Sequence, residues 1–396
     1  MSPEPRSMLW SMLAIALLVG RAATGYGAQG PSSSAPTAVD HDGMVEWMDV
    51  PRATLTPQTK SDEESARQSG RALPKPELLQ PTLDPGLPIY KPVGHTKLSG
   101  RFTGAASDVL PNLAQRWFAA FAKYYPNVHV SISPPYAGSL GAKELVNGNI
   151  DFVLVSRELK PDDIAEFKTK FGYPPLSVPI SGGSYRHFGF LDAVAFFVNK
   201  ENPIEHISFD QLDAIYSSTL LRGGTQITTW GQLGATGEWA DKPIHAYGIQ
   251  PWNGFEEFVR QHVLSVNGKR GEWREGIRYE KLVFPLARNV EQDRNAIGYS
   301  GVAYINAPVK MLALSEQGYG PYISASYENV AQASYPLSRL IYFNVNRAPG
   351  KALNPALAEF LRFVLSEEGQ QVVRDQAIYL PLRASQAVAA RALFEQ

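Results

Sequence analysis

The sequence predicts an α/β fold built from two lobes, and three observations support this prediction. From about residue 97 onward, strand-like and helix-like segments alternate, which is typical of sheets covered by helices. A length of 396 residues is long for one compact core and suits two. Hydrophobic residues make up 44% of the chain and charged residues 19%, which is a normal globular balance.

The beginning of the chain has the pattern of an export signal. Arg6 supplies a positive charge, the run from Met8 to Val19 is apolar apart from one serine, and small residues follow up to Ala28. About a dozen apolar residues are fewer than the roughly twenty that span a bilayer. We therefore expect residues 1–28 to be a signal peptide that is removed on export, with an uncleaved membrane anchor as the alternative.

Residues 29–96 differ in character from the rest of the chain. Runs such as GPSSSAPT and KPELLQPTLDPGLPIYKP are rich in proline and lack a sustained hydrophobic period. Because proline removes a backbone donor and fixes φ, such a stretch favours an extended and unpacked chain. The sequence predicts a disordered linker here.

The first folded elements follow in order from Lys97. KLSGRFTGAAS reads as a strand, and the helix after it carries one apolar stripe, formed by Leu110, Leu113, Trp117 and Phe121. Next come an alternating strand at 127–133, a helical turn at 143–148 and a continuous apolar strand at 150–156. We interpret 174–179 as a proline-rich connection.

Strands and helices also alternate in the second half. A helix begins after Ser208, which with Gln211 has the spacing of a capping box. The other expected elements are strands at 193–198, 244–249, 295–305 and 339–346, a helix at 255–264 and a long amphipathic helix at 355–375.

Composition excludes several classes of function. With 37 basic and 38 acidic residues the formal net charge is −1, so no positive field is available to hold a nucleic acid. The chain has no cysteine, which excludes thiol nucleophiles, disulfides, cysteine zinc sites and a lipoprotein anchor. Its seven histidines match no metal or catalytic-triad pattern, and no phosphate-binding glycine loop occurs. We therefore expect no cofactor, no metal and no enzyme activity.

Five separated stretches resemble the phosphate-binding components of ABC importers. They lie in the family's order between about Ser99 and Leu382: AASDVLPNLAQRW, YAGSLGAKELVNGNIDFVLVSREL, VNKENPIEHISFDQLDAIYS with ITTWGQLG, NAIGYSGVAYI, and YPLSRLIYFNVNRAPGKALNPALAEFLRFVLSEEGQQVV. The resemblance implies a type II periplasmic-binding fold whose ligand lies in a cleft between the lobes. Lobe one would comprise residues 97–190 and 297–396, and lobe two residues 191–296. It also implies a periplasmic monomer that binds phosphate or another small oxyanion and meets an ABC importer membrane complex.

Three strand-to-helix junctions of lobe one carry the ligand-binding residues that the resemblance implies. These are Ser107, Asp108 and Val109, then Gly138 and Ser139, and then Ser156 and Arg157. Hydroxyls and amides at a helix start can donate to an oxyanion, and a guanidinium can pair with it. Each junction has a structural alternative: a cap of the following helix, a plain glycine turn, and a salt bridge of Arg157 with a residue such as Asp108.

Lobe two departs from the family's pattern. Where the family has tyrosine, glycine, arginine, three variable residues, serine, glycine and threonine, this chain has Ile249 for the arginine, Asn253 for the serine and Phe255 for the threonine. In the opening motif, Val109 likewise replaces a threonine. Each charge-assisted hydrogen bond lost is worth about 1.5–3 kcal/mol. Asn253 and the amide of Gly254 are the ligand-binding groups we still expect in this lobe.

Three functions are compatible with these features. The first is an exported solute-binding protein that captures phosphate or another small oxyanion. The second, which the long linker favours, is a scaffold whose pocket has degenerated and which acts as an envelope sensor or interaction protein. The third is an exported hydrolase using Ser139, but Ala137 stands where a nucleophile elbow has its first glycine.

Overall fold

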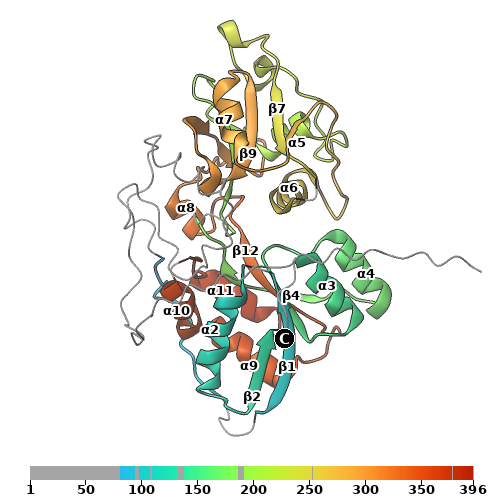
Figure 1. The fold of residues 1–396 in the computed structure, drawn as a ribbon, viewed down its shortest axis with the longest axis vertical. Coiled ribbons are helices and arrows are strands. Elements are labelled where there is room, and N and C mark those ends of the chain that lie inside the picture. Colours follow the sequence, from blue (N-terminus) through green and yellow to red (C-terminus); the bar gives the residue numbers. More distant parts are fainter. Residues whose placement is uncertain are drawn as a thin grey trace, which may run out of the picture. The chain divides into compact units, whose positions relative to one another are not determined.

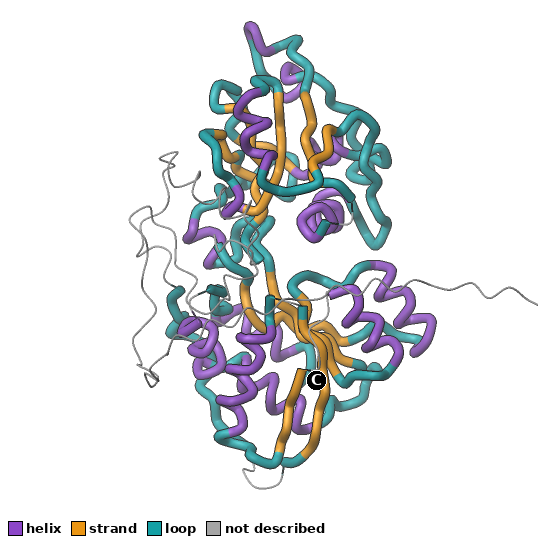
Figure 2. The backbone as a smooth tube through the Cα atoms, in the orientation of Figure 1, coloured by secondary structure: helices purple, strands orange, loops and turns teal. Residues whose placement is uncertain are grey.

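A computed structural model describes residues 81–93, 98–107, 109–132, 138–185, 191–251, 253–376 and 378–395. The expected signal peptide and most of the expected linker lie outside these ranges. The described residues form two separate five-stranded sheets, each flanked by helices (Figures 1 and 2). The expectation of an α/β fold with two sheet-centred lobes is confirmed.

The first sheet has the strand order β2-β1-β3-β12-β4. Its strands are β1 (Gly100–Ala106), β2 (Val128–Ile132), β3 (Phe152–Val155), β4 (Leu176–Gly182) and β12 (Leu340–Val345). β1 runs parallel to both β2 and β3, whereas β12 is antiparallel to β3 and β4. The sheet is therefore mixed, and its β12 strand comes from a distant part of the chain.

Helices cover both faces of this sheet (Figure 1). α2 (Pro111–Ala122) and α9 (Pro355–Val364) lie on one face, and α3 (Gly138–Asn147) and α4 (Pro161–Phe171) on the other. Side chains on β3 alternate between the two faces of the sheet. Phe152 and Leu154 pack in the core on the side of α2 and α9, and Val153 and Val155 pack in the core on the side of α3 and α4.

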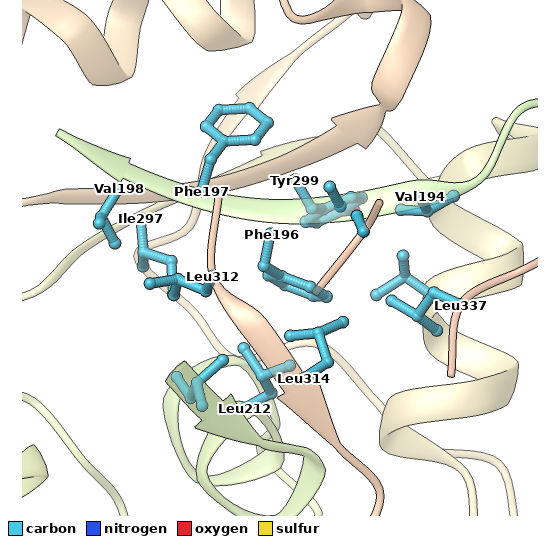
Figure 3. Close-up of a cluster of buried hydrophobic side chains, with 14 of the residues drawn as sticks. Val194, Phe196, Phe197, Val198, Leu212, Ile297, Tyr299, Leu312, Leu314 and Leu337 are labelled. Carbon is cyan, nitrogen blue, oxygen red and sulfur yellow. The ribbon is translucent and has the colours of Figure 1, made fainter. Parts of the chain in front are cut away.

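The second sheet has the order β10-β5-β9-β7-β8. Its strands are β5 (Val194–Asn199), β7 (His245–Ile249), β8 (Arg278–Glu280), β9 (Ala296–Gly301) and β10 (Val309–Met311). Phe196 and Phe197 project from opposite faces of β5 (Figure 3). Phe196 lies on the side of α5 (Phe209–Tyr216), and Phe197 packs near Val290 of α7 (Pro285–Gln292), beside Gly298.

Several smaller elements complete the described fold. β6 (His206–Ser208) pairs with β11 (Ala313–Ser315), and α6 (Gly254–Val259), α8 (Tyr327–Ala331) and α11 (Ala384–Ala392) are short helices. The expected capping box is confirmed, since the Gln211 amide donates to Ser208 Oγ at 3.2 Å and the Ser208 amide donates to Gln211 Oε1 at 2.9 Å.

The expectation of a disordered linker is wrong for residues 81–93, which pack against the first lobe. Leu87 and Tyr90 are buried, and the Tyr90 hydroxyl donates to Glu359 Oε1 at 2.8 Å. The Glu367 amide donates to the Pro88 carbonyl at 2.8 Å. Apolar and hydroxyl groups of this proline-rich stretch therefore dock it without any regular secondary structure.

Residues 174–179, which we expected to be a connection, contain most of strand β4. A proline inside a strand is tolerated where no ladder hydrogen bond is needed. β4 is the edge strand of its sheet, and the register shifts between Ile341 and Tyr342, opposite Pro179. The edge position and the irregular pairing together accommodate the proline.

The long helix that we expected at 355–375 is two helices, α9 and α10 (Glu367–Gln376). Ser366 lies between them, where its hydroxyl donates to the Phe363 carbonyl at 2.6 Å and accepts from the Gly369 amide at 3.2 Å. A β-carbon at Gly369 would collide with the carbonyl oxygens of Phe363 and Val364. The serine cap and the close backbone approach break the helix here.

The expected lobe boundary at residues 296/297 falls at the start of β9, which is the central strand of the second sheet. The core around that sheet also includes Val302, Leu314 and Leu337. The chain rejoins the first sheet only at β12. We therefore propose that the second lobe extends to about Leu337.

Candidate functional site

Two loop segments meet at one edge of the first sheet. The Ser107 amide donates to the Leu154 carbonyl at 2.9 Å, so the residue after β1 lies beside the end of β3. Ser156 and Arg157 directly follow β3. Because carboxyl ends of parallel strands share an edge, the sequence-predicted Ser107, Ser156 and Arg157 are brought together.

Ser107 is almost fully buried, with 3% of its surface exposed. Its hydroxyl oxygen has no hydrogen-bond partner among the described residues. The N-cap of α2 is Leu110, and no side chain caps that helix, so Ser107 does not act as a cap. Asp108 lies outside the described residues. A buried hydroxyl without a partner is costly, so this one is available to a ligand.

The neighbouring residue Val109 contributes its backbone rather than its side chain to a polar contact. Its carbonyl accepts a hydrogen bond of 2.5 Å from the Tyr379 hydroxyl. The Val109 side chain is partly buried and packs against the core of the first lobe. Val109 therefore anchors the start of α2 to the distant segment that carries Tyr379.

Gly138 and Ser139 begin α3, and their side chains lie outside the described part of the structure. The position of α3 itself is well defined by Gly141. A β-carbon at Gly141 would lie only 2.7 Å from Cγ2 of Val153, so glycine allows the helix to approach the sheet closely. Gly141 thus packs on β3, while a ligand-binding role of Gly138 and Ser139 stays a prediction.

Arg157 is buried, and its alternative partner Asp108 lies outside the described residues, so the salt bridge between them stays a prediction. Its Nη1 donates to the Glu158 carbonyl at 2.7 Å. Burial lowers the pKa of the guanidinium, although attraction to Asp163, Glu257 and Glu158 opposes that shift. The arginine is held in a water-poor place at the strand ends, where its charge acts strongly on a ligand.

Arg339 is a further cation at this edge that sequence reasoning missed. It directly precedes β12, whose antiparallel pairing with β3 sets it beside Ser156, and its Nη2 lies 3.4 Å from the Ser156 carbonyl. Its guanidinium also lies over two rings of α6, at 5.5 Å from the Phe255 centroid and 5.0 Å from the Phe258 centroid. Arg339 therefore contacts both lobes.

The α6 N-terminus supplies the sequence-predicted residues of lobe two. Asn253 is the N-cap, and its Oδ1 accepts from the Phe255 amide at 2.9 Å. Gly254 is exposed, while Phe255 packs edge-on against Tyr304 at 5.4 Å. Ile249 is fully buried in the core. The position that carries the arginine in the resembled family thus points into the core here, and Trp252 lies outside the described residues.

The first turn of α6 carries two buried carboxylates, Glu256 and Glu257. Glu256 pairs with Arg260 and also accepts from Trp273 Nε1 at 2.6 Å. Glu257 accepts two hydrogen bonds from Arg270, at 2.9 and 3.0 Å. Acidic groups already complement the positive end of this helix dipole, so α6 is a weaker anion site than a helix without them.

A contact between a histidine and a carboxylate joins the two lobes next to Arg157. Oε2 of Glu158 lies 2.9 Å from Nε2 of His262, which belongs to a π-helical turn (Arg260–Leu264), and the Tyr342 hydroxyl donates to Oε1 at 2.7 Å. Burial would raise the pKa of Glu158, but the contacts with His262 and Tyr342 lower it to about 2. Gln261 Nε2 adds a contact of 3.3 Å to the Leu159 carbonyl.

Two kinds of feature are absent from the described residues. Among them, no group of three or more histidine or acidic side chains is arranged to hold a metal ion. No helix in the described ranges is long and apolar enough to cross a membrane. Two α/β lobes whose buried cations meet at strand ends have the architecture of a solute-binding protein.

Known proteins agree with this class. Residues 91–368 match the model of a PBP superfamily domain. The phosphate-binding protein PstS of Pseudomonas aeruginosa is 36% identical over 307 residues, which cover 77% of this chain and 90% of that protein. The protein SphX of Synechococcus elongatus is 25% identical over 290 residues, covering 72% of this chain and 79% of its own. The chain belongs to the PBP superfamily and, within it, to the family of the phosphate-binding protein PstS.

A solved structure is also similar, at a lower level. The crystal structure of PstS from Borrelia burgdorferi is 16% identical with a TM-score of 0.49, and the match covers 72% of this chain and all (100%) of that one. The family assignment rests on the sequence relatives. The resemblance noted in the sequence is confirmed by them, and the 36% identical relative is named for phosphate binding.

Proposed function

We propose that this protein is a solute-binding receptor that captures phosphate, or another small oxyanion, at the edge formed by Ser107, Ser156 and Arg157. The observation that carries the proposal is the buried Ser107 hydroxyl without a partner at the same strand ends as a buried arginine. An oxyanion would accept from both groups, which water reaches poorly. The family supports phosphate as the ligand.

Calorimetric titration of the purified protein with phosphate, and with sulfate in parallel, tests this proposal. We expect phosphate to bind with a micromolar or lower dissociation constant. Ser107→Ala should weaken binding about 10- to 100-fold, because one hydrogen bond to a charged ligand, worth about 1.5–3 kcal/mol, is lost. Ser131→Ala is a matched control, since its Oγ lies on β2 and contacts the Phe102 carbonyl at 3.4 Å. No heat at millimolar phosphate would exclude the receptor and favour the degenerate scaffold.

The cellular setting is part of the same proposal. The receptor is exported to the periplasm, acts as a monomer, delivers its ligand to an ABC importer membrane complex and catalyses no reaction. The family and the signal-like first residues support this setting. Phosphatase or esterase turnover that disappears in Ser139→Ala would overturn the non-catalytic part alone.

A further inference from the structure

Arg339 carries a buried charge that no carboxylate of the described residues approaches within ion-pair distance. Only 8% of its surface is exposed, and it forms no ion pair within the described part of the chain. Its Nε is buried and has no hydrogen-bond partner there. Its polar contact with Ser156 is long, at 3.4 Å, and its other contacts are ring faces. Such an arginine is costly unless an anion pairs with it.

The surrounding charges show why an anion would be favoured. Burial lowers the pKa of Arg339 to about 10, and the nearby positive charge of Arg157 lowers it as well, while Asp192 and Glu158 only partly compensate. Glu158 is already engaged by His262 and Tyr342. Asp192 accepts from the Ala303 amide at 2.9 Å. Two buried guanidinium groups thus act on the same small region of the strand ends.

The location of Arg339 suits a site whose second lobe lacks the family's arginine. In lobe two, Ile249 is in the core and α6 has acidic groups in its first turn, so the start of α6 offers little positive charge. Arg339 rests on the Phe255 and Phe258 rings of α6 and reaches the Ser156 backbone of lobe one. It therefore lies where a ligand held between α6 and the strand ends would be.

We propose that Arg339 is a direct ligand of the bound oxyanion and supplies, from the start of β12, the guanidinium that lobe two lacks at Ile249. This inference rests on the proposed function. A planar guanidinium with a buried, unpartnered Nε can donate in fork geometry to two oxygens of a tetrahedral anion. The two phenylalanine rings hold the group flat and exclude water from it.

The test is calorimetric titration with inorganic phosphate of the full chain, of Arg339→Gln and of Arg339→Lys. We expect Arg339→Gln to lose about 10- to 100-fold in affinity, and Arg339→Lys to lose less because it keeps the charge without the fork. Arg347→Gln is the matched control, because it follows the opposite end of β12 and its Nε is likewise buried without a partner.

A purely structural role for Arg339 gives a different result. The variants would then unfold at lower temperature both with and without phosphate, while the dissociation constant and the phosphate-induced rise in melting temperature stayed as in the unaltered protein. That outcome, or an equal loss of affinity in Arg347→Gln, overturns the inference and leaves the receptor function standing. Absence of phosphate binding in the unaltered protein overturns the receptor function itself. If Arg339→Gln does not fold, Arg339→Lys decides by the same comparison.

Discussion

At the scale of single residues, Ile249 shows that the family's arginine cannot simply be restored. Its side chain is fully buried in the core of the second lobe. We expect Ile249→Arg to lower the free energy of unfolding by roughly 3–5 kcal/mol, because the new charge would be buried without a counterion. Thermal or denaturant unfolding measures this loss. Met311→Arg, at a half-exposed position of the same sheet, is the control and should cost little. Tighter phosphate binding by a stable Ile249→Arg protein would contradict the placement of this side chain.

The same residues show how far the sequence can predict a site. Ser107, Ser156 and Arg157 could be predicted because the family resemblance implies ligand-binding residues there, each at the end of a strand-like segment. Arg339 precedes an apolar run, but its role depends on that strand entering the sheet antiparallel to β3. The contact from Arg339 to Ser156 spans 183 residues of sequence. Periodicity carries no information on such a pairing, so the arginine was missed.

At the scale of elements, the contact of Glu158 with His262, between the loop after β3 and the π-helical turn, predicts a pH dependence of stability. The folded-state pKa of Glu158 is lowered to about 2 from an ordinary value of 4.5. The stabilisation of the folded state by the ionised Glu158 carboxylate is therefore fully present above pH 4.5 and is lost as the pH falls from there toward 2. Because 32% of the Glu158 side chain is exposed, solvent screening limits the effect to about 1–2 kcal/mol. Denaturant unfolding between these pH values should show the decline.

Two variants separate the effect of this contact from that of the many other carboxylates that titrate in acid. Glu158→Gln should be less stable than the unaltered protein at neutral pH and should lose less stability on acidification. His262→Ala should raise the pKa of Glu158 and shift the loss toward higher pH. Glu316→Gln, at an exposed position of the second lobe, is the control. Identical pH profiles for all four proteins would show that this contact contributes nothing to stability.

The predicted element boundaries were correct where a local sequence pattern determines them and wrong where tertiary packing determines them. Ser208 and Gln211 form the expected capping box because both partners lie within one turn. The sequence did not predict β4, because its proline is accommodated only by the position of the strand at the edge of the sheet. The break between α9 and α10 depends on a close backbone approach at Gly369. The apolar periodicity of the sequence continues through this break, so the periodicity did not predict it.

At the scale of the whole molecule, the first lobe is assembled from two distant parts of the chain, before β5 and after Leu337. The sequence resemblance predicted the two-lobed order correctly. The residue at which the chain returns to the first lobe depends on which sheet includes β9. That choice is made by the pairing of β9 with β5 and β7.

The packing of residues 81–93 on the first lobe leads to a prediction about the stability of the protein. Tyr90 is buried, packs edge-on against Tyr124 and Phe363 at centroid distances of 5.1 and 5.2 Å, and donates to Glu359. Tyr90→Ala should therefore cost about 3–5 kcal/mol of unfolding free energy, as for other large buried aromatics. Tyr90→Phe should cost only about 1 kcal/mol, because the packing stays and one hydrogen bond is lost. Val93→Ala, at an exposed position of the same segment, is the control and should be near neutral. Equal stability of Tyr90→Ala and Val93→Ala in denaturant titrations would show that this segment is not part of the cooperative fold.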